Sequence, residues 1–203
     1  MLYLSGHKSK PVEGDLAAGT IGLLLSPNND YTLDAVAVWA ADNGAFTDRY
    51  PGDDAFMVWL DRYTRHRRRC LFVAAPDVVG DAQSTLELFP PMAARLRAAG
   101  WPVALVGQDG MENLNVPWHL TDWLFIGGST GWKLGAGAAA LIRQAQAAGK
   151  RVHVGRVNSA RRFGLFAGLD CDTADGTFLA FGPDKNLPAV RAWSTAPVQG
   201  LIA

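Results

Sequence analysis

Carboxylates, amides and glycines follow most of the short apolar runs in this sequence. A loop needs only turn-forming residues, so packing alone does not demand this supply of hydrogen-bonding groups. A ring of such groups around one opening suits recognition of a small polar heterocycle. The polar segments are Asp42-Asn43-Gly44, Pro76-Asp77, Gly107-Gln108-Asp109, Gly127-Gly128-Ser129-Thr130, Gly155-Arg156-Val157-Asn158-Ser159 and Asp172-Thr173-Ala174-Asp175-Gly176.

The apolar runs that precede these segments alternate with stretches of helical spacing, which is the pattern of βα units. About eight strands are expected, the number that closes a barrel. We therefore predict an α/β fold, a minimal TIM-type (β/α)8 barrel; an open doubly wound sheet is the alternative, and either architecture places chemistry at the carboxyl ends of its strands. The expected strands are 2–4, 20–25, 36–40, 71–75, 103–106, 123–126, 152–154 and 169–174. The expected helices are 53–67, 81–99, 133–148, 160–167 and 187–193.

Composition favours one globular domain over residues 1–203. The chain is 49% apolar and 19% charged, enough to bury a substantial core. Met1–Gly6 is too short for the apolar region of a signal peptide, and no run approaches the roughly 20 residues of a membrane span, so we expect a soluble cytoplasmic protein. The two cysteines and four histidines show no zinc-ligand spacing, and we expect no metal and no cofactor.

Several of the polar segments resemble one family when they are taken in order along the chain. Asp42-Asn43-Gly44-Ala45-Phe46-Thr47 is similar to the D-S-G-G-F-Q element of the tRNA-guanine transglycosylases, and 170–175 is similar to their G-x-D-x-x-D element. Asp77, Gln108 and the pair Gly127-Gly128 fall where that family contacts the heterocycle. The family's zinc-binding C-x-C-x-x-C is missing, so the chain looks most like the shortened phage relatives, the deazapurine DNA modification proteins called DpdA.

This resemblance implies a base-exchange reaction through a covalent intermediate. Asp175 would be the nucleophile that holds the sugar, and Asp42 the acid and base that serves the departing and incoming bases. The expected reaction replaces guanine in DNA by a 7-deazaguanine such as 7-cyano-7-deazaguanine (preQ0). The residues expected to bind the base are Phe46, Asp77, Gln108, Gly127, Gly128 and Asp172.

The expected partner is duplex DNA with its target guanine flipped out of the stack. Basic and polar residues after a strand, at the start of a helix, would hold the phosphates. Because the formal net charge is zero, an accessory DNA-binding protein is a further expected partner; a phage-encoded chain would act in the cytoplasm of an infected cell. The expected DNA contacts are Arg156, Asn158, Ser159, Arg161, Arg162 and Lys8.

Other interpretations remain open at the level of sequence. One alternative is a transglycosylase that acts on tRNA instead of DNA. A second is a glycosidic-bond hydrolase that uses the same carboxylates, and a third is a barrel that binds a base without catalysis. Asp42 and Asp175 also suit simple turn or helix-capping roles. The basic run 62–69 precedes a strand, which places it at the opposite end of a barrel, where a solvated helix end is the plainer interpretation.

Overall fold

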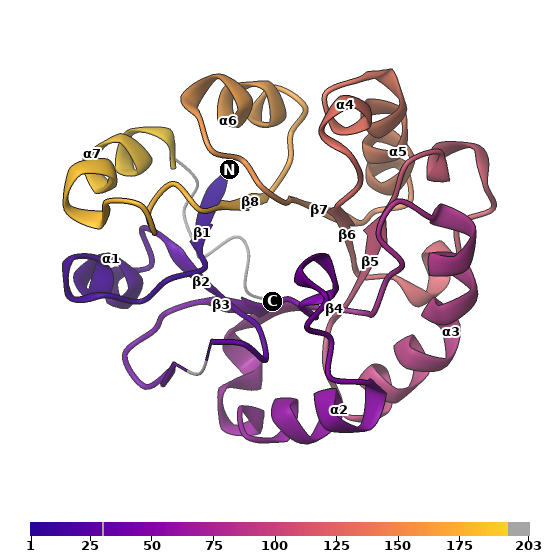
Figure 1. Cartoon of the computed structure of the whole chain (residues 1–203), viewed down its shortest axis with the longest axis horizontal. Helices are drawn as coiled ribbons and strands as arrows, with labels where there is room; N and C mark the ends of the chain where they lie inside the picture. Colours follow the sequence, from indigo (N-terminus) through magenta and orange to yellow (C-terminus); the bar gives the residue numbers. More distant parts are fainter. Residues whose placement is uncertain (30, 195–203) are drawn as a thin grey trace.

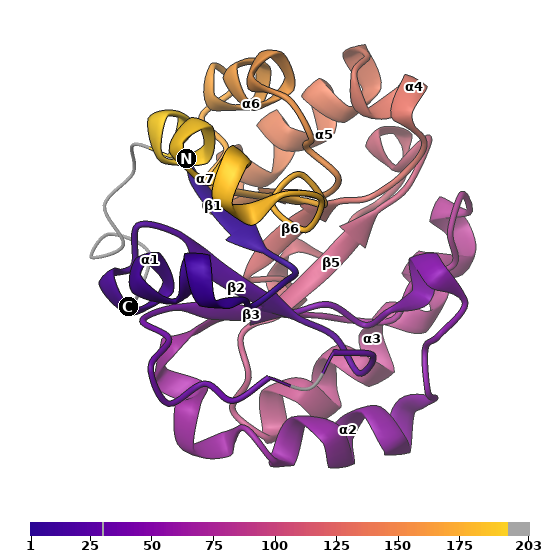
Figure 2. The same cartoon turned by 60° about the vertical axis from the view of Figure 1, so that its left-hand side comes forward.

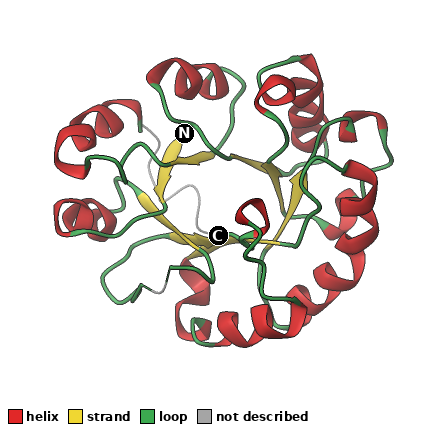
Figure 3. Cartoon of the chain, viewed as in Figure 1, coloured by secondary structure: helices red, strands yellow, loops and turns green. Residues whose placement is uncertain are grey.

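The chain folds into a closed barrel of eight parallel strands surrounded by helices, seen in a computed structural model that describes residues 1–29 and 31–194. Each strand pairs with the next, and β8 pairs with β1 to close the ring. Figure 1 looks down the barrel, and Figure 3 shows the ring of strands inside a ring of helices. The predicted (β/α)8 barrel is confirmed, and the open sheet is excluded.

The strands are short, three to five residues each. Figure 2 shows them running together through the molecule with the helices packed outside. The strands are β1 (Leu2–Ser5), β2 (Gly22–Leu25), β3 (Trp39–Ala41), β4 (Cys70–Ala74), β5 (Val103–Gly107), β6 (Trp123–Ile126), β7 (Arg151–Val154) and β8 (Thr173–Gly176). The helices are α1 (Glu13–Ala18), α2 (Asp53–Asp61), α3 (Ala82–Ala98), α4 (Thr130–Lys133), α5 (Ala136–Ala147), α6 (Ala160–Ala167) and α7 (Pro183–Trp193). Short 3-10 helices are η1 (Lys10–Val12), η2 (Ala45–Thr47), η3 (Thr64–Arg69), η4 (Met111–Asn113) and η5 (Trp118–Leu120).

Two apolar layers hold the barrel together. One layer lies between the strands and the surrounding helices and includes Trp39, Phe89 and Leu141. The other is the filling of the barrel itself and includes Phe72 and Trp123. Side chains in a strand alternate between the two faces, so each strand supplies both layers.

The last strand lies further along the chain than the sequence pattern predicts. The predicted strand 169–174 begins on an apolar run that belongs to the turn after α6, whereas β8 begins at Thr173. Asp172 therefore precedes the strand instead of following it. Its carboxylate accepts a hydrogen bond from the Val152 N–H at 2.7 Å, at the end of the barrel where the strands begin.

Two helical segments also differ from the prediction. The expected helix 133–148 is divided into α4 and α5 at Gly135, whose extended backbone begins α5. α1 fills the short link between β1 and β2, where no helix was expected. Across residues 1–29 and 31–194, no helix is long and apolar enough to cross a membrane.

Candidate active site

A cavity of about 540 Å³ opens where the strands end, and we call it the carboxyl-end cavity. It lies where (β/α)8 enzymes place their active sites. Seven of the eight strands contribute, through their last residues or the loops that follow them. The lining residues are Ser26, Asp42, Asn43, Gly44, Phe46, Thr47, Asp77, Val79, Val106, Gln108, Phe125, Gly127, Gly128, Thr130, Gly155, Arg156, Asn158, Arg162, Asp175 and Thr177.

Asp175 enters the cavity from β8 and is held by a histidine on the neighbouring strand. His153 Nε2 lies 3.0 Å from Asp175 Oδ1, and His153 Nδ1 lies 2.8 Å from the Thr173 hydroxyl. The imidazole is fully buried against the rings of Phe125 and Phe72, and this burial lowers the pKa of His153. A neutral imidazole that donates from Nε2 and accepts at Nδ1 satisfies both contacts and orients the carboxylate of Asp175.

Asp42 is the second carboxyl group of the cavity, directly after β3. Its Oδ1 accepts a hydrogen bond from the Gly44 N–H at 2.9 Å, in a turn where Gly44 has a φ of 83°. Burial raises the pKa of Asp42 to about 6, and the nearby charges of Asp175 and Asp77 act in the same direction. The group is therefore suited to exchange a proton near neutral pH.

Asp77 is the centre of a buried amide network. Its two oxygens accept hydrogen bonds from Asn43 Nδ2 at 2.8 Å and from Gln108 Nε2 at 2.7 Å. The Gln108 amide oxygen accepts from the Gly80 N–H at 3.0 Å. Asn43 and Gln108 are almost completely buried, and burial raises the pKa of Asp77. These contacts stabilise the wall of the cavity, and they already engage both ends of the Gln108 amide.

Arg156 spans the opening of the cavity. Its guanidinium donates through Nη2 to the carbonyl oxygens of Gly127 and Gly128, and it lies 4.2 Å from the ring centroid of Phe46. Arg156 has a φ of 61°, a left-handed conformation that is uncommon outside glycine and often marks functional sites. The Phe46 ring is 57% exposed, so the stacked pair forms one rim of the cavity.

The structure brings most of the predicted site residues together. Asp175, Asp42, Phe46, Asp77, Gln108, Gly127, Gly128, Arg156, Asn158 and Arg162 all line the carboxyl-end cavity. Ser159 caps the start of α6, where its hydroxyl accepts from the Arg162 N–H at 3.3 Å, and Arg161 is exposed on the same helix.

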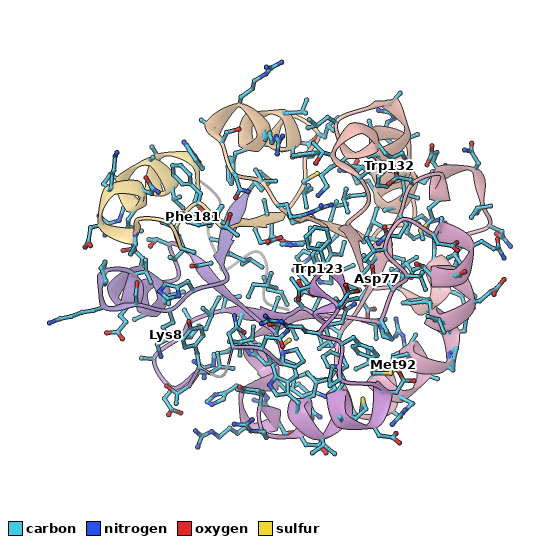
Figure 4. All side chains as sticks on the ribbon, viewed as in Figure 1. Lys8, Asp77, Met92, Trp123, Trp132 and Phe181 are labelled. Carbon is cyan, nitrogen blue, oxygen red and sulfur yellow. The ribbon has the colours of Figure 1, made fainter. Side chains whose placement is uncertain are left out.

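Two predicted residues lie elsewhere. Asp172 is at the opposite end of the barrel, because β8 begins after it, so its expected contact with the base is wrong in position. Lys8 donates to the Thr32 carbonyl at 2.8 Å and does not line the cavity. Figure 4 shows Lys8 toward the outside of the barrel and well apart from Asp77.

Sequence reasoning did not include His153 or Lys133 among the site residues. His153 is the last residue but one of β7, within the pattern of a strand, and the sequence carries no sign of its partner on β8. Lys133 is buried behind the cavity wall, where its ammonium donates to the Gly155 carbonyl at 2.5 Å. Burial, with help from the charge of Arg156, lowers the pKa of Lys133 to about 7. In the described part of the chain, no three His, Cys, Asp or Glu side chains are grouped to hold a metal ion.

Comparisons with known proteins place this chain among (β/α)8 barrels. No protein-family model and no curated protein matches it. A solved 4-hydroxy-2-oxoglutarate/2-dehydro-3-deoxyphosphogluconate aldolase from TTHB1 is similar at 16% identity with a TM-score of 0.58, over 100% of this chain and 93% of that one. A ligand-free mutant tryptophan synthase from M. tuberculosis has 14% identity and a TM-score of 0.54, with the same two coverages. An HpcH/HpaI aldolase from Desulfitobacterium hafniense has 10% identity and a TM-score of 0.50, over 97% and 93%.

These findings contradict the predicted activity. The similar structures named above are two aldolases and a tryptophan synthase, so the prediction of a guanine-exchanging transglycosylase, and of a glycosyltransferase in general, is wrong. The tRNA and hydrolase variants of that prediction are wrong with it. At such low identity the likeness shows the fold, and the reaction has to be argued from the site. The likeness to the transglycosylase family itself and the expected DNA, deazaguanine and accessory-protein partners are not tested and stay predictions.

Proposed function

We propose that this protein is a lyase that cleaves, or in reverse forms, a carbon–carbon bond in a small anionic hydroxy-oxo acid by acid–base catalysis. The observation that carries the proposal is the pair Asp42 and Asp175, two carboxyl groups in different environments that face one cavity. Asp42 has a pKa raised to about 6, whereas Asp175 accepts a hydrogen bond from a buried histidine. Two carboxyl groups set apart in this way can serve as acid and base in one reaction.

The proposed reaction is a retro-aldol cleavage. Asp175 removes the proton of the substrate hydroxyl, and the O–H electron pair forms the new carbonyl of an aldehyde. The carbon–carbon bond breaks, and its electron pair passes to the neighbouring oxo group as an enolate. Asp42 in its protonated form donates its proton to the enolate, which becomes the second product, an oxo acid. Solvent then returns the proton from Asp175 to Asp42, so the enzyme is restored.

Two arginines are placed to bind the anionic end of such a substrate. Arg156 uses Nη2 for the Gly127 and Gly128 carbonyls, which leaves Nε and Nη1 for a ligand. The guanidinium of Arg162 lines the same cavity and has no hydrogen bond or ion pair with residues 1–29 or 31–194. Guanidinium groups bind carboxylates and phosphates through paired hydrogen bonds. The cavity volume of about 540 Å³ is in the range of small-molecule sites.

The structural neighbours support this reaction class. Of the similar structures described above, two are named as aldolases, and one of those names includes 4-hydroxy-2-oxoglutarate. That likeness concerns the barrel, so the residues of this chain carry the argument for the chemistry.

A panel of small hydroxy-oxo acids, beginning with 4-hydroxy-2-oxoglutarate, tests the proposal through release of the oxo-acid product. We expect turnover by the parent protein and a loss of about 10²–10⁴-fold in kcat in Asp175→Asn and in Asp42→Asn, because each variant lacks one proton-transfer group. Asp48→Asn is the matched control, since Asp48 is exposed and outside the cavity lining. Absence of turnover on every substrate of the panel, or full activity in both cavity variants, would overturn the proposal.

A further inference from the structure

A second cavity, of about 490 Å³, opens at the opposite end of the barrel, where the strands begin; we call it the amino-end cavity. It is assigned to this end because its lining includes the first residues of β4, β6 and β7 and the turns before them. The floor includes the indole of Trp123, which belongs to the apolar filling of the barrel. Figure 4 shows Trp123 within the ring of strands. None of its lining residues takes part in the site at the carboxyl end.

The charge of the amino-end cavity is strongly unbalanced. Arg67 and Arg68 come from the end of η3, and Lys150 and Arg151 come from the turn before β7 and its first residue. Asp122 is the one acidic residue of the lining, and both its oxygens are engaged. Oδ1 pairs with Arg97 at 2.9 Å, and Oδ2 accepts from the Val103 N–H at 2.8 Å. The cavity thus collects four cationic side chains from two separate segments, with no uncommitted carboxylate among its lining residues.

Two of these cations have local roles that explain their position. Arg67 donates to the carbonyl of Ala99 at 2.5 Å, at the end of α3, where a cation is favourable. Arg151 lies 5.6 Å from the ring centroid of Trp123, a cation–π contact. Neither role accounts for Arg68 or Lys150. Their side chains form no hydrogen bond or ion pair with any other residue of the described ranges 1–29 and 31–194.

We propose that the amino-end cavity binds a small polyanion through its phosphate groups. Several cations around one hollow repel one another, and an anion with more than one charge relieves that repulsion. Guanidinium groups match the tetrahedral oxygens of phosphate by paired hydrogen bonds, and lysine adds a point charge. The volume fits a compound of the size of pyrophosphate or a nucleotide. The ligand would bind at the far end of the barrel from the proposed catalytic carboxylates and need not be the substrate.

Titration of the purified protein with pyrophosphate by calorimetry tests this proposal, with citrate as a polyanion that lacks phosphate. We expect saturable binding of pyrophosphate that weakens as sodium chloride is added. In the double variant Arg68→Gln/Lys150→Gln, affinity should fall by about tenfold or more, because two charged contacts are lost. Arg143→Gln is the matched control, since Arg143 is exposed on α5 and lines neither cavity.

The location of the anion is tested with Arg156→Gln, which alters the carboxyl-end cavity alone. Unchanged pyrophosphate affinity in that variant supports the amino-end site and is independent of whether the lyase proposal holds. A loss in Arg156→Gln with none in Arg68→Gln/Lys150→Gln would place the anion at the other end and overturn the proposal. Equal losses in Arg143→Gln and the double variant, tighter binding of citrate, or no saturable binding would overturn it as well. Circular dichroism of every variant establishes that each is folded.

Discussion

The two ends of the barrel hold cavities of similar volume, about 540 and 490 Å³, but they differ in how their polar groups are held. At the carboxyl end, carboxyl groups are half-buried, hydrogen-bonded and shifted in pKa, as Asp42 and Asp77 are. At the amino end, the charges belong to long basic side chains, and two of these, Arg68 and Lys150, form no hydrogen bond or ion pair within residues 1–29 and 31–194. An acid whose pKa is shifted by its surroundings suits proton transfer, whereas accessible cations suit reversible binding of an anion.

This difference has a physical origin in the parallel barrel. The loops at the carboxyl end lead from strands into helices, and they place short side chains such as Asp and Asn directly at the rim. The turns at the amino end lead from helix ends into strands, where cations are favoured by the helix dipole. The aromatic filling of the barrel lies at the inner end of both cavities. The ring centroid of Phe72 lies 5.2 Å from that of Trp123, which lines the amino-end cavity, and 5.9 Å from that of Phe125, which lines the carboxyl-end cavity.

The largest effect on the free energy of unfolding is expected in the aromatic filling that separates the two cavities. Phe72 is fully buried between them, and Phe72→Ala should lower the free energy of unfolding by about 3–5 kcal/mol, because a large ring is replaced by a void. Urea unfolding measures this loss. Phe181→Ala is the matched control, since that ring is 86% exposed, and it should change stability by less than about 0.5 kcal/mol. Similar small losses in both variants would mean that the two cavities are not divided by a packed core.

A smaller effect on the free energy of unfolding is expected from Asp42, the half-buried acid at the carboxyl end. Because the pKa of Asp42 is raised from 3.8 in the unfolded chain to about 6, protonated Asp42 contributes stability at low pH. That contribution is lost as the pH rises from 3.8 through about 6. Asp42→Asn removes the loss, so between about pH 4 and about pH 8 the variant should gain about 2–3 kcal/mol relative to the parent protein.

Urea unfolding at a series of pH values measures this gain, and Asp48→Asn should show none. An Asp42→Asn stability curve parallel to that of the parent would show that the carboxyl group titrates as an exposed one. The carboxyl end would then not differ from the amino end in holding an acid with a shifted pKa.

The smallest effect on the free energy of unfolding is expected at the amino end. Arg68→Gln should change the free energy of unfolding by less than about 0.5 kcal/mol, because its side chain is exposed and has no partner in the described ranges. Thermal unfolding without an anion measures this. Addition of pyrophosphate should raise the Tm of the parent more than that of the variant, because a ligand stabilises the state that it binds. A marked loss of stability in Arg68→Gln without ligand would assign the side chain a structural role instead.

Much of the barrel could be predicted from the sequence, because strand and helix patterns are local. The strand Trp123–Ile126 and the helix Ala160–Ala167 have the predicted bounds. The error at β8 is also local in origin. Its cavity-facing positions carry polar groups, among them Asp175, whereas the preceding turn contains the apolar residues Leu169 and Cys171. A strand whose inner face serves a site does not show the usual apolar alternation.

The candidate site could be predicted only in part. Residues that follow strands, such as Asp42 and Asp77, were found because every strand of a parallel barrel delivers its last residues to the same end. The role of Gln108 could not be foreseen, because its amide is engaged by Asp77 and by the Gly80 backbone. The predicted reaction rested on a resemblance of short motifs, and such motifs occur at the strand ends of many barrels.

The sequence by itself determined the alternation of strands and helices and the end of the barrel at which most of the polar residues gather. The closed ring decided which of them meet. His153 and Asp175 are partners because β7 and β8 pair in parallel, and Arg68 and Lys150 line one cavity because the turns before β4 and β7 open into it. A strand or helix pattern depends on neighbouring residues. These two pairs bring together positions 22 residues and more than 80 residues apart in the sequence, and they form only when the barrel is closed.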